Sequence, residues 1–294
     1  MENMLELQVT ILSLIAVGVL IRKIGLVPAA FQKNLTDLVI YLVLPCNIVS
    51  SFARQTQGEG MWTDFITIFF ISLVTLIFSI LYGRWLFRRE GEDRKRCLVY
   101  GMLCPNSGFL GNPIAEGVFG AQGLMLASVF LVPQRVFMWS VGLAIFSESI
   151  DRRETARKVV THPCVLACLI GIVLMAFRVN VPGVIQTPID TIGRCNTALS
   201  MLVIGMILSE IEPRALLNKT LFQYTLQRLV LLPLIVYIVL RFLPVSSLVR
   251  GTSVLLTAMP AGATTSMLAS RYDRDPHFAT SMIIQSTLFS IPAL

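Results

Sequence analysis

Residues 104–113 read Cys104-Pro105-Asn106-Ser107-Gly108-Phe109-Leu110-Gly111-Asn112-Pro113, inside an apolar stretch at 97–119. Two prolines, two glycines and two asparagines in ten residues are incompatible with a regular helix, because proline lacks the backbone N–H and blocks the preceding turn. The whole stretch is nevertheless long enough to cross a bilayer. Inside a membrane, such a break is tolerated only where freed backbone is buried in protein or faces a water-filled cavity. We therefore predict a broken transmembrane helix.

A second break follows in the other half of the chain. Residues 259–266 read Met259-Pro260-Ala261-Gly262-Ala263-Thr264-Thr265-Ser266. A shift of 155 residues places Pro105 on Pro260 and Leu7 on His162, where the first and sixth apolar stretches begin. The two halves therefore correspond in hydropathy and in the position of their breaks, although their identity is low.

The composition places most of the chain in lipid. Hydrophobic residues make up 55% of 294 residues and charged residues only 14%, and the mean hydropathy is +0.74. Soluble domains carry about 25% charged residues. Ten apolar stretches predict ten spans, at 7–27, 35–53, 63–86, 97–119, 122–147, 162–179, 188–209, 220–242, 248–270 and 277–294.

Orientation follows from lysine and arginine. With the N-terminus outside, 17 of the 24 fall in inside loops and four, Arg54, Arg178, Arg241 and Arg250, in outside loops. This bias predicts that both termini lie outside, in the manner of a multi-pass plasma (inner) membrane protein. It also accounts for the net charge of +7 without nucleic acid as a partner.

Each half holds an odd number of spans, so the second half enters the membrane upside down. We predict an all-α integral membrane fold of two inverted five-helix repeats, residues 1–147 and 162–294, joined by a cytoplasmic loop at 148–161. Helices four and nine are broken and cross. The last span stops before the position that matches the end of its counterpart near Phe146.

The breaks predict an anion site near the middle of the membrane, because the N-terminus of a helix presents free N–H groups and a positive dipole end. Asn106 and Asn112 are the predicted donors to the substrate, although capping the helix ends is an alternative role. The site also takes in Ser107 and Gly108 between them, with Thr264 and Thr265 as weaker donors from the second break. Pro105, Gly111, Pro113, Pro260 and Gly262 create the breaks.

Two further polar residues lie within predicted spans. Asn47 follows Pro45 and either lines the same cavity or caps carbonyls that Pro45 releases. Arg135 is the one formal charge placed near a midplane. It either neutralises a substrate carboxylate or bonds carbonyls released by Pro133. We expect Arg194 and Arg228 to extend from span ends to the interface.

Other chemistry is not indicated. The six cysteines form no CxxC pair, and we predict that they are buried small apolar residues. The sequence contains no metal motif, no nucleotide-binding loop and no catalytic triad. We therefore predict no metal, no cofactor and no enzymatic activity. No acidic residue is placed at a midplane, so neither a proton relay nor a sodium cage is apparent.

With these features together, the chain resembles the auxin efflux carrier family over essentially its whole length. The resemblance is carried by Leu44-Pro45 followed by Phe52, by Asn106-x-x-Phe109-x-Gly111, and by Ala258-Met259-Pro260-Ala261. Asn106 matches a position near the crossover that contacts substrate in relatives. Ala261 departs from the family, which has an asparagine after the second proline, and this puts a symmetric pair of amides in doubt.

The resemblance implies a permease of organic anions, such as malonate and malate in bacteria. It also implies a scaffold of helices one, two, six and seven, a transport domain of helices three to five and eight to ten, elevator-like motion and a homodimer. Coupling to protons or to sodium stays open. The alternatives are a sodium-coupled carrier of the bile-acid symporter type and a membrane sensor that binds its ligand without moving it. A channel is disfavoured because no filter-like ring of residues occurs.

Overall fold

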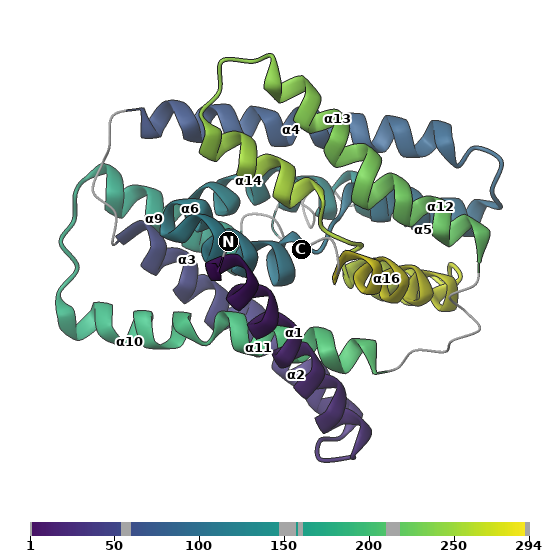
Figure 1. The fold of residues 1–294 in the computed structure, drawn as a ribbon, viewed down its shortest axis with the longest axis horizontal. Coiled ribbons are helices and arrows are strands. Elements are labelled where there is room, and N and C mark those ends of the chain that lie inside the picture. The colour runs from purple at the N-terminus through teal and green to yellow at the C-terminus, as the bar shows by residue number, and fades with distance from the viewer. Residues whose placement is uncertain (1, 54–59, 147–156, 158–160, 210–217, 292–294) are drawn as a thin grey trace.

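A computed structural model describes residues 2–53, 60–146, 157, 161–209 and 218–291. Within this part of the chain, regular secondary structure is helical (Figure 1), and one isolated β-bridge joins Pro105 to Ala261. The predicted connecting loop at 148–161 lies outside the described residues except at 157 and 161. Arg54, which was assigned to an outside loop, and Arg214, one of the 17 assigned to inside loops, also lie outside them. The all-helical class is thus confirmed.

The helices of the first half are α1 (Glu2–Lys23), α2 (Ala29–Leu38), η1 (Val39–Val43), α3 (Leu44–Ala53), α4 (Met61–Leu86), α5 (Glu92–Leu103), η2 (Ser107–Gly111), α6 (Asn112–Trp139) and α7 (Val141–Phe146). Those of the second half are α9 (Pro163–Ala176), α10 (Gly183–Arg194), α11 (Asn196–Leu208), α12 (Lys219–Leu226), η4 (Gln227–Leu231), α13 (Leu232–Arg241), α14 (Ser247–Thr257), α15 (Thr264–Arg271) and α16 (Pro276–Ser290).

Among the described residues, five helical segments are long and apolar enough to cross a membrane. They are Ala30–Ala53, Met61–Leu86, Ser107–Phe146, Gly183–Leu208 and Lys219–Arg241. Large apolar side chains on α4, such as Phe70, Val74 and Leu81, are exposed and suit a lipid environment. The count of ten spans and their inverted repeat stay predictions.

Three π-helical turns in the described part of the chain share one cause. Each ends immediately before a residue followed by proline, at Leu44-Pro45, Asn112-Pro113 and Leu232-Pro233. In each, the residue before the proline donates its N–H to the carbonyl five positions back. Because proline removes the next N–H and crowds the preceding turn, the helix widens by one residue there.

The junction between the predicted fourth and fifth spans is a sharp bend. Gly120 interrupts α6 with φ of 66° and ψ of −160°, a conformation that favours glycine. The predicted boundary between residues 119 and 122 therefore falls on a real change of direction.

The helices pack in two groups. In one, α1 lies against α11, and α3 lies against α9 and α10; in the other, α4, α5, α6 and α14 pack together, and α16 packs on α12 and α15. Figure 1 shows α4 along one edge of the molecule and the α10–α11 pair along the opposite edge. The groups meet where α6 contacts α3 and α9, and where α11 contacts η2 and α16.

The prediction that all six cysteines are buried is wrong at two positions. Cys195 is exposed at the junction of α10 and α11, and Cys46 is half-buried, whereas Cys97, Cys104, Cys164 and Cys168 are buried. The Cys195 thiol donates to the Thr191 carbonyl.

Candidate functional site

The two breaks lie against each other. The Asn106 N–H donates to the Pro260 carbonyl at 2.7 Å, and the Gly262 N–H donates to the Cys104 carbonyl at 3.0 Å. Only glycine fits at position 262, because a Cβ there would lie 2.9 Å from the Cys104 carbonyl oxygen. Pro105, Pro260 and Gly262 thus form a crossover of α5 and η2 with α14 and α15, held by backbone hydrogen bonds.

Side chains also bond backbone carbonyl and N–H groups near the two breaks. Ser107 Oγ donates to the Leu256 carbonyl at 3.1 Å, and Gln134 Nε2 donates to the Pro105 carbonyl at 3.0 Å. Ser286 Oγ accepts from the Ala261 N–H. The crossover is therefore a fixed structure in which buried backbone groups have partners. Because the Ser107 hydroxyl donates to the Leu256 carbonyl, Ser107 has a structural role in the crossover.

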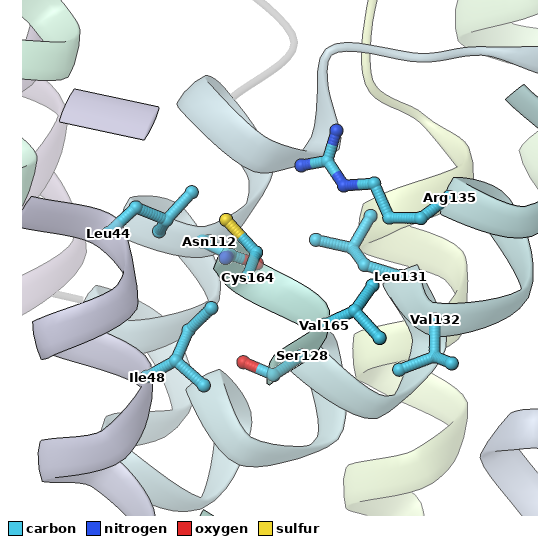
Figure 2. A pocket seen from close by; sticks show the side chains of 9 residues that line it. All are labelled: Leu44, Ile48, Asn112, Ser128, Leu131, Val132, Arg135, Cys164 and Val165. Atoms are coloured by element: carbon cyan, nitrogen blue, oxygen red, sulfur yellow. The ribbon is translucent and has the colours of Figure 1, made fainter. Parts of the chain in front are cut away.

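A small cavity adjoins the crossover, between α3, α6 and α9 (Figure 2). Its volume of about 10 Å³ is that of a single water site. Apolar side chains make up most of its wall, with polar contributions from Asn112, Ser128, Arg135 and Cys164. The cavity lies at the contact between the two groups of helices, and two of the predicted site residues share it.

Asn112 is the least satisfied polar side chain in this wall. It is fully buried, and neither its Nδ2 nor its Oδ1 has a hydrogen-bond partner. Its place at the start of α6, directly after the π turn, fixes the side chain at the cavity. A buried amide without partners is unfavourable unless a ligand or water supplies them.

Arg135 reaches the cavity from the far end of α6. Its Nε is buried without a partner, and its Nη2 would lie 2.8 Å from a Cβ at Gly108. Gly108 therefore admits the guanidinium against the backbone of the first break. The Pro133 carbonyl interpretation gains no support, because none of the described residues accepts a hydrogen bond from Arg135.

The remaining predicted residues lie around the crossover. The Asn106 side chain is half-buried, and its backbone carbonyl accepts from Leu110 and Gly111. Gly111 packs on α14, since a Cβ there would lie 2.8 Å from Leu256 Cδ2. Pro113 occupies the first turn of α6. These positions shape the break from which Asn112 projects.

Thr264, Thr265 and Asn47 are outside the wall of this cavity. Thr264 is half-buried; Thr265 is fully buried and its hydroxyl has no partner. Asn47 Nδ2 lies 3.2 and 3.4 Å from the two carboxylate oxygens of Glu116, and its Oδ1 accepts from Asn196. Asn47 thus links α3 to α6 and α11.

Arg228 corrects the sequence interpretation. It was expected to extend from a span end, but it lies inside η4 with only 2% of its surface exposed. Its Nε donates to the Met259 carbonyl and its Nη1 to the Met102 carbonyl, each at 3.0 Å. Its near-central place in the apolar segment Lys219–Arg241 was the available signal. Gln134 and Ser128 were also missed, because single polar residues in an apolar helix have no distinctive spacing.

The described residues include no group of His, Cys, Asp or Glu side chains that could hold a metal ion. The polar side chains at the cavity are an amide, a guanidinium, a hydroxyl and a thiol. This set can bind a carboxylate through hydrogen bonds and charge.

Comparison with known proteins gives the family. The model of the membrane transport protein family matches residues 3–294. The chain is 24% identical to an uncharacterized transporter of Methanocaldococcus jannaschii over 98% of this chain and 95% of that protein. It is 25% identical to an uncharacterized transporter of Methanothermobacter thermautotrophicus over the same shares. The chain is therefore a multi-pass integral membrane protein that belongs to the membrane transport protein family, the family of the auxin efflux carriers.

Proposed function

We propose that this protein is a secondary carrier of small organic anions such as malonate or malate, with its binding site at the cavity of Asn112 and Arg135. The observation that carries the proposal is the fully buried Asn112 amide without a partner, which faces the same cavity as a guanidinium. A carboxylate supplies acceptors for the Asn112 N–H groups and a counter-charge for Arg135.

The backbone supports an anion in the same place. Ser107 and Gly108 begin the second half of the first broken helix, so their N–H groups have no preceding helical carbonyl to bind. The N-terminal end of a helix attracts negative charge through these groups and the dipole. Gly108 also contacts Arg135, so the two positive features converge.

The arrangement of the helices supports movement of the site. The cavity lies between α3 and α9 on one side and α6 on the other, and its volume of about 10 Å³ admits roughly one water molecule. Malonate is larger, so the walls have to part before it enters. In the proposed elevator, α4–α7 and α12–α16 carry the substrate past a scaffold of α1–α3 and α9–α11.

The proposed membrane arrangement has ten spans in two inverted repeats, with both termini outside the bacterial inner membrane. It rests on the alternation of charged loops and on the two breaks at matching positions. The scaffold is also the proposed contact of a homodimer. Light scattering of the purified protein in detergent gives the mass that tests the dimer.

Flux in proteoliposomes tests the function. Tracer uptake and current are measured with malonate, malate, lactate and an indole carboxylate, and Arg135→Gln protein is the control. We expect saturable uptake of one or more of these acids, and weaker apparent affinity in the variant. Tight binding without flux would favour a sensor, and absence of both flux and binding would overturn the anion proposal.

A further inference from the structure

Arg228 lies where the crossover concentrates negative partial charge. Met102 is in the last turn of α5, and Met259 lies two residues beyond the last residue of α14, Thr257. Carbonyls at the C-terminus of a helix lack intrahelical donors and carry the negative end of the dipole. The guanidinium bonds one carbonyl at the C-terminal end of α5 and one just beyond that of α14, so it places positive charge at both ends at once.

In carriers built on broken helices, such carbonyls are also what coordinates a transported monovalent cation. In this protein, the carbonyls at the crossover already accept hydrogen bonds from protein groups. The carbonyls of Cys104, Pro105, Leu256 and Pro260 accept from protein donors, and those of Met102 and Met259 accept from Arg228. The adjacent cavity, which Arg228 and Gln134 help to line, has a volume of only about 10 Å³.

We propose that Arg228 is a built-in cation that replaces a coupling sodium ion at the crossover, so that the carrier needs no sodium there. The inference rests on the proposed carrier function only for its consequence in transport. The guanidinium stays charged at any physiological pH, so the positive charge at this point is permanent rather than exchangeable. Arg228 is a positioning residue: it holds the crossover, while Asn112 and Arg135 face the ligand cavity.

Thermal unfolding of the purified protein tests this without a transport assay. The unfolding temperature is measured in sodium, potassium or choline chloride at equal ionic strength, and again with millimolar guanidinium. We expect the unfolding temperature of the wild-type protein to be the same in all of them. Arg228→Ala should lower it by roughly 10 °C, because two buried carbonyls lose their donor.

The distinguishing result is rescue. Guanidinium should restore much of the loss in Arg228→Ala with a saturable dependence, and sodium should now stabilise that variant. Arg241→Ala is the matched control, because Arg241 is an exposed arginine on the same helical segment. We expect neither destabilisation nor rescue there.

A specific stabilisation of wild-type protein by sodium would overturn the proposal. So would an Arg228→Ala variant that responds to neither guanidinium nor sodium. If that variant does not fold, Arg228→Lys keeps the charge, and the proposal then requires that it fold and stay indifferent to sodium. Absence of carboxylate flux by the wild-type protein would refute the proposed function and leave this result standing.

Discussion

The unpartnered amide of Asn112 predicts a trade between stability and function. Burying an amide without hydrogen bonds costs about 1–3 kcal/mol, so replacing it with an apolar group of similar size removes that cost. We expect Asn112→Leu to unfold at the same or a higher temperature, while substrate affinity falls at least tenfold. Thermal unfolding and ligand titration measure the two effects.

Asn47→Leu is the control, since Asn47 is buried with hydrogen bonds to Glu116 and Asn196. Asn47→Leu removes these hydrogen bonds between helices, and stability should fall. If Asn112→Leu is the less stable of the two, the Asn112 amide has a structural partner and the site proposal loses its main support.

Gly108 gives a second prediction at this scale. A Cβ at position 108 would lie 2.8 Å from Arg135 Nη2, so Gly108→Ala should displace the guanidinium without changing any charge. We expect the apparent affinity for the anion to fall about as far as in Arg135→Gln. Dose–response curves of flux compare them, with Gly91→Ala at the start of α5 as the control, because a Cβ there meets nothing within 4 Å. Normal affinity in Gly108→Ala would separate Arg135 from the site.

The sequence predicted where the helices break better than it predicted the hydrogen-bond partners of single side chains. Prolines and glycines fixed both breaks, because their backbone restrictions are local. Arg228 was misjudged, because whether a long cationic side chain reaches water or turns inward depends on carbonyls far away in sequence. The sequence does not distinguish Asn112 from Asn47. In the structure, the Asn112 amide has no hydrogen-bond partner, whereas Asn47 links three helices.

Among the elements, α1 and α11 approach unusually closely. A Cβ at Gly18 would lie 2.4 Å from the Leu202 carbonyl oxygen, and one at Gly205 would lie 2.2 Å from the Ile15 carbonyl oxygen. Small residues allow such backbone contact between helices in a membrane. Because the atoms that a Cβ would meet are backbone atoms, a side chain at either glycine should force the pair apart.

We therefore expect Gly18→Val to lower stability by about 1–3 kcal/mol or more, the usual cost of overpacking. Gly183→Ala, where a Cβ meets nothing within 4 Å, should be nearly neutral. Unfolding temperatures in detergent give the comparison. A Gly18→Val protein as stable as the wild type would mean that α1 is not held against α11.

The existence of helices was predictable, and their internal irregularity only in part. Long apolar stretches with no soluble alternative specify helices directly. The prolines at 45, 113 and 233 predicted an irregularity in each helix, but the sequence alone did not distinguish a kink from a widened π turn. A proline is compatible with either outcome, since Pro133 lies inside α6 without a π turn.

For the molecule as a whole, the proposed elevator requires α6 to slide past α9. Cys164 on α9 and Val132 on α6 line the same cavity. In a background with the other cysteines replaced by alanine, joining Cys164 to a cysteine at position 132 with a short thiol cross-linker should stop transport. Cleaving the linker should restore it.

A cross-link inside the proposed transport domain is the control. Cys97 on α5 donates to the Arg274 carbonyl, so Cys97 and a cysteine at position 274 are close. That link should leave flux unchanged. Equal transport with both links closed would contradict relative sliding of the two groups.

The hydropathy pattern and the alternation of charged loops predicted an all-helical membrane protein, because the bilayer acts on every span in the same way. The meeting of the two breaks followed from their matching positions. The side-chain hydrogen bonds that close the crossover could not be predicted in this way. They come from Gln134, Ser286 and Arg228, which lie on three other helices.

The near-water-sized cavity at Asn112 has an osmotic consequence. If it opens to receive a carboxylate, it must also fill with water, and it must shed that water on closing. Solutes too large to enter, such as sucrose, would then draw water out of the open form and favour the closed one. Transport should slow as external water activity falls, and the slope of the logarithm of the rate would count the water molecules exchanged in each cycle.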